Sequence, residues 1–547
     1  MKKVFDNLFF RISVVAVLFI AFGIMLVYSA KTDSLTSDEP VHISAGYLKT
    51  YGDFRFNFEH PPLINYLSGW SVRLLVNPQK SLHNPNEQYA YGDDFLFLSG
   101  NNAQDIIFAA RIPVVILSLL LALVIFLWAR RLWGYWGGVI ALTLTVFCPT
   151  MLAHGHLATT DMGSVFFLVL SMYVMSRFVQ APNIRKVFIL AIVLGLTLAA
   201  KHSTIIILPI AYLIFLVSTI AKKINWKQFI GYAILTTFVA LAVLWFCYFL
   251  SMYQSFSWHP QPYTMYDFLK GKIFSNWYTQ LIFMPIDYYW RGLVFVKHHA
   301  ETGHMSYLNG EFKIEGWWYY FPLAFWYKTL IPTMIMFALS IFAMVKIRAK
   351  YIAEELLIFL LPIIYFITSM TTKLDIGVRH IMIIYPFIYL SIGRLAKIYL
   401  KNKMLNLFAR LVIIGLIFWA IAESIYYYPN DIAYFNQVAG GPQNGYQHLS
   451  DSNVDWGQDL SKINAYMNKK GYNNYTLLRC DESPRYDFYQ TRSKIMGDKL
   501  PFDGDYVAIR VWCFHLPKDS SDPIYQKIKE MKPIDNVGYS ILIYKIN

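Results

Sequence analysis

Long apolar segments recur along most of the chain, and they constrain its fold more than any other feature of the sequence. A helix that crosses the hydrocarbon core of a membrane needs roughly 20 mainly apolar residues. With 56% hydrophobic and only 15% charged residues among 547, the chain could not bury so much apolar surface as a soluble globule. We therefore predict a polytopic α-helical membrane protein with about eleven transmembrane helices. Their centres lie near residues 20, 117, 144, 170, 193, 211, 239, 333, 362, 388 and 415.

Lysine and arginine residues fall in every second gap between these apolar segments. They precede the first segment and follow the second, fourth, sixth, eighth and tenth. Because cations near the ends of spans are retained in the cytoplasm, this alternation predicts an inner N-terminus and an outer C-terminus. The net charge of +14 is then mostly topological and gives little reason to expect a nucleic-acid partner. The first segment lacks a convincing cleavage site, and we interpret it as a retained anchor.

The same topology places three hydrophilic regions on one outer side of the membrane. They are the loops at about residues 31–105 and 251–320 and the tail at 428–547. We expect residues 1–427 to form the transmembrane domain, with interfacial helices in its outer loops. Alternating apolar and polar residues in the tail are typical of strands, so we predict a small extracytoplasmic α/β domain there.

Two of the four cysteines, Cys480 and Cys513, lie in this tail. An oxidising compartment would permit a disulfide between them. The sequence does not decide whether they pair. Cys148 and Cys247 lie in apolar segments, where we interpret them as packing residues.

Two carboxylates stand directly outside the first apolar segment, in Ser37-Asp38-Glu39-Pro40. An acid held near apolar surface and lipid headgroups can have a raised proton affinity, which suits general-base work on a hydroxyl or amine. The same residues also form a good helix start, with Ser37 or Asp38 as the cap and Pro40 in the first turn. Both interpretations stay open, since a capping residue can also act in catalysis.

Further outer acids and histidines are candidates for a site. Glu59 and His60 precede two prolines, which restrict their geometry, although a simple turn into an interfacial helix is the alternative. Asp161 closes a short outer gap, where a carboxylate at the membrane surface is a functional candidate. His154 and His156 could hold a divalent metal together with Glu59, but two histidines are a weak metal signal. The sequence establishes no cofactor.

Cations suited to phosphate binding belong to the same face. Lys201 interrupts an apolar run, and Arg379 and His380 open the tenth segment. Arginine binds phosphate oxygens through two hydrogen bonds, and lysine supplies a compact charge. These residues could hold a lipid phosphate, although Arg379 could instead only pair with Asp375.

Taken in order, these motifs resemble those of the type C glycosyltransferases, which include the protein O-mannosyltransferases and the aminoarabinose transferases of lipid A. The stretches at residues 307–311, 316–322 and 451–460 resemble bacterial members identified as phospholipid-carrier-dependent glycosyltransferases. The motifs that carry the resemblance over the membrane region are Asp38-Glu39, Glu59-His60-Pro61-Pro62-Leu63, Thr160-Asp161 and Gly377-Val378-Arg379-His380.

This resemblance implies the type C fold, a polyprenyl-phosphate-linked sugar as donor, and transfer at the outer face with inversion at the anomeric carbon. It implies that Asp38 is the catalytic base or positions the acceptor, and that Glu39 and Asp161 are supporting acids. His60 stands where the aminoarabinose transferases have a lysine near the donor phosphate, whereas the O-mannosyltransferases share His-Pro-Pro. It is therefore open whether His60 contacts phosphate, with Lys201 and the Arg379-His380 pair, or a metal. The lack of a glycine-rich nucleotide motif suits a lipid carrier.

The stretch at residues 451–460, which we call the tail motif, mixes carboxylates, amides and one indole. Such a mixture can bind sugars through hydrogen bonds to hydroxyls and stacking on a ring face. An ordinary helix start, with an acid or amide as the cap, is the alternative. We predict sugar or acceptor binding by Asp451, Asn453, Asp455, Trp456, Gln458 and Asp459.

The function predicted from these observations is that of an inverting glycosyltransferase in the bacterial inner membrane, with its active site on the periplasmic face. A lipid or sugar transporter is the alternative, but it should show ionisable groups near the bilayer midplane and often an internal repeat. Neither is found in the sequence, and a non-catalytic assembly protein is a third option. The sequence does not specify the acceptor, since protein hydroxyls, lipid A and other envelope glycans all fit.

Overall fold

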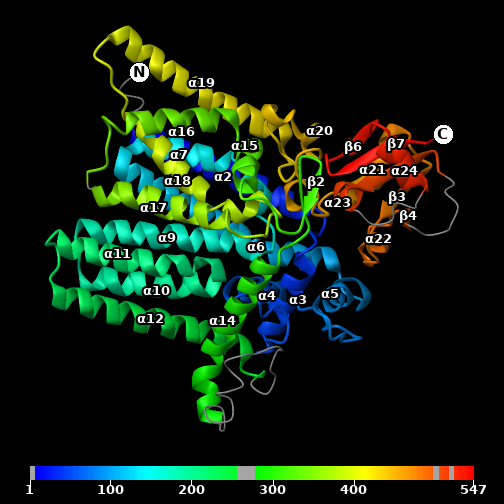
Figure 1. Ribbon diagram of the computed structural model, residues 1–547, viewed down its shortest axis with the longest axis horizontal. Coiled ribbons are helices and arrows are strands. Elements are labelled where there is room, and N and C mark those ends of the chain that lie inside the picture. Colours follow the sequence, from blue (N-terminus) through cyan, green and yellow to red (C-terminus); the bar gives the residue numbers. More distant parts are fainter. Residues whose placement is uncertain (1–6, 256–276, 351, 497–503, 517–522, 547) are drawn as a thin grey trace.

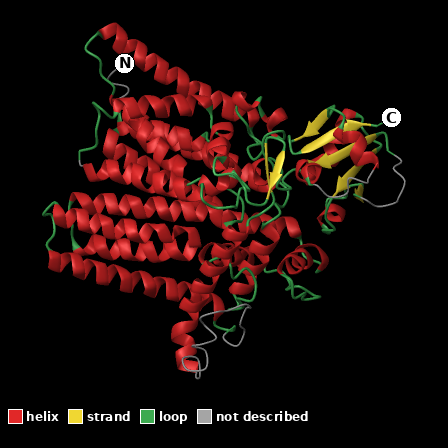
Figure 2. Cartoon of the chain, viewed as in Figure 1, coloured by secondary structure: helices red, strands yellow, loops and turns green. Residues whose placement is uncertain are grey.

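The protein consists of a helical bundle with a small sheet-containing domain at one of its ends (Figures 1 and 2). The computed structural model describes residues 7–255, 277–350, 352–496, 504–516 and 523–546. Part of the second outer loop predicted from the sequence, residues 256–276, lies outside the described residues.

The bundle accounts for all eleven predicted apolar segments, because the centre of each lies in a helix. Within the described residues, seven helical segments are long and apolar enough to cross a membrane, or eight if α15 (Tyr320–Lys328) and α16, which meet at 111°, form one span. The polytopic helical class is thus confirmed, and the count of eleven spans stays a prediction. The helices at the predicted centres are α2 (Leu8–Thr32), α6 (Ala103–Trp133), α7 (Tyr135–Val146), α9 (Thr160–Gln180), α10 (Ile184–Ala200), α11 (Ile207–Ile220), α12 (Trp226–Met252), α16 (Ile331–Ala343), α17 (Ile352–Ser369), α18 (Ile384–Ile392) and α19 (Lys403–Tyr427).

Some predicted spans are interrupted rather than continuous. Helix α7 ends shortly before Pro149, which begins α8 (Pro149–His154). Proline lacks an N–H group and clashes with the preceding turn, so it starts a helix more readily than it continues one. Helix α18 is likewise flanked by the short 3₁₀ segments η3 (Val378–Ile381) and η4 (Gly393–Lys397). These breaks explain why fewer helices than apolar segments have the full length of a span.

Short helices cover the end of the bundle that faces the sheet domain. Helices α3 (Glu39–Lys49) and α4 (Leu63–Leu75) pack closely at Gly46. A Cβ at this position would lie only 2.3 Å from the Asn65 carbonyl oxygen, so a larger residue would not fit. The other elements here are η2 (His202–Ile206), α5 (Gln88–Asp93), the π-helical turn η1 (Asp94–Leu98), α14 (Trp277–Thr302) and the hairpin β1–β2 (Ser306–Leu308, Glu311–Lys313).

The tail forms the α/β domain predicted from its alternating sequence. Its five strands are ordered β4-β3-β5-β7-β6, with β3 parallel to β4 and β5 and with β7 antiparallel to β5 and β6. Cys480 and Cys513 form a disulfide. The strands are β3 (Tyr475–Arg479), β4 (Ser493–Ile495), β5 (Tyr506–Arg510), β6 (Asp535–Val537) and β7 (Ile541–Lys545), and the helices are α21 (Ile463–Lys470), α22 (Arg485–Phe488), α23 (Val511–His515) and α24 (Pro523–Lys529).

A connecting segment joins α19 to the sheet domain. It is largely irregular and passes along the end of the bundle before the first strand begins. Its short helical pieces are η5 (Gln437–Ala439), α20 (Pro442–Gly445), η6 (Asp451–Asn453) and η7 (Leu460–Lys462).

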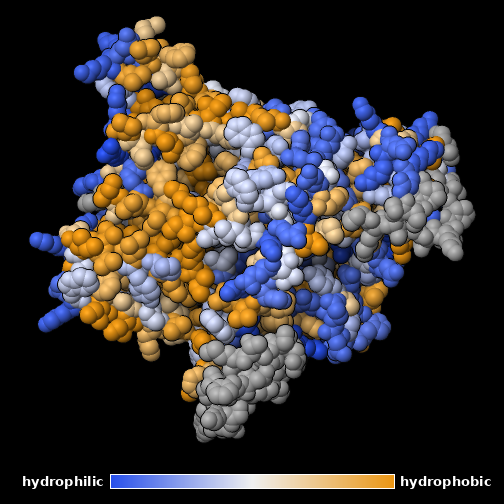
Figure 3. Space-filling model, in the orientation of Figure 1, coloured by the Kyte–Doolittle hydropathy of each residue, from blue (hydrophilic) through white to orange (hydrophobic). Residues whose placement is uncertain are grey.

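Apolar side chains cover the flank of the bundle, and hydrophilic side chains gather over the sheet domain and at the opposite tips of the helices (Figure 3). The turns from α9 to α10 and from α11 to α12 lie at the end away from the sheet domain (Figure 1). The turns and the adjoining helix ends carry cations such as Lys222 and Arg185. This polarity agrees with a protein whose sheet domain and cation-bearing turns face opposite sides of a membrane.

Candidate active site

A cavity of about 1490 Å³ lies where the covered end of the bundle meets the sheet domain. Its walls combine outer loops, helix ends and the tail, which are far apart in sequence. It brings together most of the residues predicted from the sequence. Those that line it are Asp38, Glu59, His60, Asp161, Lys201, Arg379, His380, Asp451, Asp455 and Trp456.

Asp38 occupies the N-cap position of α3, yet its side chain makes no capping hydrogen bond. One of its oxygens instead accepts a hydrogen bond from Arg379 Nη1 at 2.9 Å. The side chain is 31% exposed, so it is open to the cavity. The predicted capping role therefore does not occupy the carboxylate, and Asp38 is placed to meet a bound molecule.

Arg379 is the central cation of the cavity. Besides Asp38, its Nη1 lies 3.6 Å from an oxygen of Asp161, and its guanidinium carbon is 4.1 Å from the centre of the Trp456 ring. Its Nε is buried without a hydrogen-bond partner among the described residues. In the described part of the chain, Arg379 pairs with Asp38 and Asp161 and not with Asp375. The Asp375 carboxylate instead accepts the backbone N–H of Trp317 at 2.7 Å.

Asp161 and Lys201 form a second charged pair beside Arg379. Asp161 lies in the first turn of α9, where the helix dipole favours a carboxylate, and Lys201 follows the last residue of α10. Lys201 Nζ is 2.5 Å from Asp161 Oδ1. Asp38, Asp161 and Lys201 thus lie at helix ends. A transporter would be expected to hold such charged groups within its spans.

Histidines line the wall next to Lys201. The rings of His42 and His60 lie 5.0 Å apart. Burial, together with nearby His42 and Lys201, lowers the pKa of His60 well below its usual value, so its ring is neutral near pH 7. His380 Nε2 and both ring nitrogens of His202 are buried without hydrogen-bond partners among the described residues. The cavity therefore holds several polar nitrogens that are free to bind a ligand.

Glu39 is placed differently from the sequence prediction. Its side chain is fully buried and pairs with Arg111, whose Nε and Nη2 lie 2.8 and 2.7 Å from its two oxygens. The carboxylate also accepts hydrogen bonds from the backbone N–H groups of Thr36 and Ala158. Both oxygens of Glu39 have partners, the residue is not among those lining the cavity, and its carboxylate holds the outer segment to Arg111. Its predicted role as a supporting acid stays a prediction.

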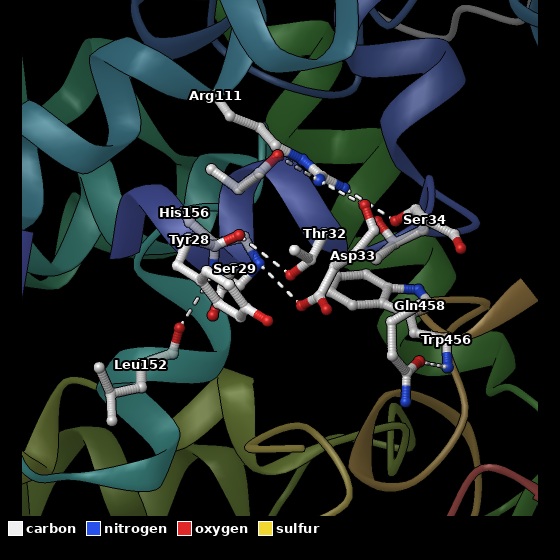
Figure 4. A network of polar contacts seen from close by, with 12 residues as sticks. Tyr28, Ser29, Thr32, Asp33, Ser34, Arg111, Leu152, His156, Trp456 and Gln458 are labelled. Carbon is white, nitrogen blue, oxygen red and sulfur yellow. Dashed lines mark hydrogen bonds and ion pairs between the residues drawn. The ribbon is translucent and has the colours of Figure 1, made fainter. Parts of the chain in front are cut away.

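The three predicted metal ligands do not converge. His156 Nδ1 bonds to the Leu152 carbonyl at 3.0 Å, and its Nε2 lies 3.2 Å from Asp33, as Figure 4 shows. His154 packs against Trp456, and Glu59 accepts a hydrogen bond from Gln88. Among the described residues no group of three histidine, cysteine or acidic side chains is arranged to hold a metal ion. We therefore assign no step to a metal at these positions.

The tail motif divides into residues that face the cavity and residues that hold the backbone. Asp451, Asp455 and Trp456 line the cavity. Asn453 instead accepts the N–H of Val378 and donates to Tyr320. Two further motif residues, Gln458 and Asp459, also have internal partners and do not line the cavity. Direct sugar or acceptor binding by Asn453, Gln458 and Asp459 stays a prediction.

Several residues that build the site were not predicted. Arg111 anchors Glu39 from within α6, and an arginine among the apolar residues of this helix was a usable signal. Asp33 Oδ1 is 2.9 Å from Lys462, which joins the end of α2 to the tail. Figure 4 shows this buried region beside Trp456 and Gln458. Arg485 and Arg510 line the cavity from the sheet domain, and no spacing in the sequence indicated their position.

Comparisons with known proteins bear on this geometry. Residues 98–248 match the family described as dolichyl-phosphate-mannose-protein mannosyltransferase. The whole chain is similar in fold to the crystal structure of ArnT from Cupriavidus metallidurans bound to undecaprenyl phosphate, at 13% identity and a TM-score of 0.50, covering 96% of this chain and 97% of that one. This is the type C glycosyltransferase fold.

A second solved structure supports the same assignment. The oligosaccharyltransferase of Archaeoglobus fulgidus in its apo form aligns at 12% identity and a TM-score of 0.50, over 91% of this chain and 65% of that one. No curated protein matches the chain. The predicted fold class and the resemblance to type C glycosyltransferases are confirmed.

Proposed function

We propose that this type C glycosyltransferase moves a sugar from a polyprenyl-phosphate carrier to an acceptor on the outer side of a bacterial inner membrane. The observation that carries the proposal is the meeting of one accessible carboxylate, Asp38, with the cations Arg379 and Lys201 in a single cavity at the ends of the helices. Such a cavity can admit a lipid carrier from the membrane and a polar acceptor from the other side.

Transfer from a sugar phosphate needs a base for the acceptor and positive charge for the leaving phosphate. Asp38 is the base in this proposal, since its carboxylate is partly exposed in the cavity and lies directly beside Arg379. Arg379 and Lys201 stabilise the phosphate as the bond to the sugar breaks, and neutral His60 adds a hydrogen bond. Direct attack by the acceptor inverts the anomeric carbon, which NMR of the product can test.

The lipid carrier is supported by both kinds of comparison. The description of the matched family, dolichyl-phosphate-mannose-protein mannosyltransferase, names a lipid phosphate. The ArnT structure, which aligns along nearly its full length, was solved with undecaprenyl phosphate bound. Asp161 would restrain Arg379 and Lys201 before the donor enters, and the unpartnered Arg379 Nε supplies a further donor. The alternating cations of the sequence support a periplasmic site.

A direct test uses the purified full-length protein in lipid nanodiscs with undecaprenyl-phosphate-linked sugars and an envelope extract from a strain that lacks the gene. We expect mass spectrometry to detect undecaprenyl phosphate release together with one new glycosylated product. Asp38→Asn should abolish both signals while leaving donor binding intact. A well-folded wild-type preparation that consumes no lipid-linked sugar in any extract, while the strain lacking the gene keeps all its glycans, would contradict the proposal.

A further inference from the structure

The cavity contains a second centre of positive charge, on the side formed by the sheet domain. Arg485 begins α22, and its side chain faces the cavity while the residue is only 8% exposed. Its Nε donates to Ser483 Oγ at 2.8 Å, but its Nη1 is buried without a hydrogen-bond partner among the described residues. A buried arginine nitrogen left unpaired is costly unless an anion binds there.

Other groups engage both oxygens of one nearby acid and one oxygen of a second. Asp481 accepts hydrogen bonds from Tyr486 and from the backbone of Ser483 and lies 3.6 Å from Arg510. One oxygen of Asp93 accepts a hydrogen bond from Ser483. Burial raises the pKa of Asp93, whereas the charge of Arg485 lowers it. Arg485 Nη1 bonds to neither acid among the described residues, so it remains available to an anion.

Backbone geometry at Gly457 places this charge beside the tail motif. A Cβ on Gly457 would lie 3.5 Å from Arg510 Nη2 and 3.7 Å from Arg485 Nη1, so both guanidinium groups face the same point of the tail motif. Gly457 has φ +98°, a conformation that glycine adopts without strain. Its neighbour Trp456 supports Arg379 on the other side.

We propose that Arg485 binds an oxyanion, a phosphate monoester or carboxylate, carried by the acceptor. Arg510 is a positioning residue, because Asp455 and Tyr486 already occupy its nitrogens. This inference rests on the proposed function and adds the chemical class of the acceptor. Arg379 and Lys201 would then bind the phosphate of the donor, and Arg485 would bind the oxyanion of the acceptor.

The test uses the full-length protein in nanodiscs of zwitterionic lipid, first saturated with undecaprenyl phosphate so that the donor cations are occupied. Glycerol 3-phosphate is then titrated in calorimetry as a soluble probe, and phosphatidate in the nanodisc serves as a lipid probe. We expect one of the two to bind saturably. Arg485→Gln should weaken that binding roughly tenfold to hundredfold, as expected for a lost charge-assisted hydrogen bond.

Two controls make the result specific. Arg479→Gln removes a cation of the same domain that packs over Tyr486 and is not among the residues lining the cavity, and it should leave binding unchanged. Arg485→Lys keeps the charge and should retain part of the affinity. Equal affinity in wild type and Arg485→Gln, or no saturable binding of either probe, would overturn the inference. Failure of undecaprenyl phosphate alone to bind would instead contradict the proposed donor.

Discussion

Asp38 and Glu39 are neighbours in the sequence and have opposite surroundings in the structure. Asp38 faces the cavity, holds one hydrogen bond to Arg379 and remains partly exposed. Glu39 points the other way, is completely buried and satisfies both oxygens with Arg111 and backbone N–H groups. A carboxylate with spare capacity can accept a proton from a substrate, whereas one that is fully bonded can only hold the structure in place.

The same contrast separates two larger groups of charges. Around Asp38, the cations Arg379 and Lys201 line the cavity and can exchange their present partners for a ligand. Around Glu39, buried pairs connect α2 and α6 with the tail. The first group should therefore control activity and the second stability, and each of the following changes tests that division.

The largest effect on stability is expected for Glu39→Gln. This change leaves the Arg111 charge buried without its carboxylate, and breaking such a pair typically costs about 3–5 kcal/mol. The free energy of unfolding in detergent measures the loss. The double variant Glu39→Gln with Arg111→Met should recover part of it, and a single variant as stable as the wild type would show that the pair contributes little.

A smaller effect is expected for Arg379→Ala and Lys201→Ala, on binding rather than on stability. Each removes a charge-assisted contact worth roughly 1.5–3 kcal/mol, so affinity for polyprenyl phosphate should fall more than affinity for neutral polyprenol. Lys297→Ala is the control, because that lysine is exposed on α14. An equal loss for both lipids would assign the two cavity cations a structural role.

Asp33 should make stability depend on pH. Although burial opposes ionisation, Lys462 and His156 lower the pKa of Asp33 from 3.8 to about 2. A carboxylate with a lowered pKa stabilises the fold above about pH 4, and this contribution of about 2 kcal/mol is lost as the pH falls from about 4 to about 2. Unfolding free energies at pH 5, 4 and 3 should fall more steeply for wild type than for Asp33→Asn, and parallel curves would contradict the assignment.

The smallest effect on donor binding is expected for Trp456→Ala. The indole ring contacts the Arg379 guanidinium, and a cation–π contact is worth about 0.5–2 kcal/mol. The Michaelis constant for the donor should rise a few-fold, and the melting temperature should also fall because the ring is buried. Trp318→Ala, at an exposed indole, serves as control. A large loss of thermal stability with normal kinetics in the folded fraction would place Trp456 with the structural group.

The sequence predicted the membrane helices well because hydrophobicity is a local property. Each predicted centre falls in a helix, and the alternating tail forms a sheet. Interrupted spans such as α7 and α18 were harder to predict, since proline and short 3₁₀ segments shorten helices without lowering hydrophobicity.

The candidate site was predictable only in part. Motifs in the sequence predicted Asp38, Asp161 and Arg379 as site residues, and the fold places them together. The direction of a side chain depends on tertiary packing, however, so Glu39 could not be separated from its neighbour. For the same reason, nothing local showed that Arg485 reaches the cavity, because it comes from another domain.

The central claim is that one accessible carboxylate, Asp38, serves as the base while its neighbour Glu39 only supports the fold. The most direct measurement is the turnover number of Asp38→Asn with a saturating polyprenyl-phosphate sugar, alongside its melting temperature. The account predicts that turnover falls by about 10² or more, with a melting temperature and donor affinity close to those of the wild type. Near-normal turnover in a well-folded Asp38→Asn protein would contradict it.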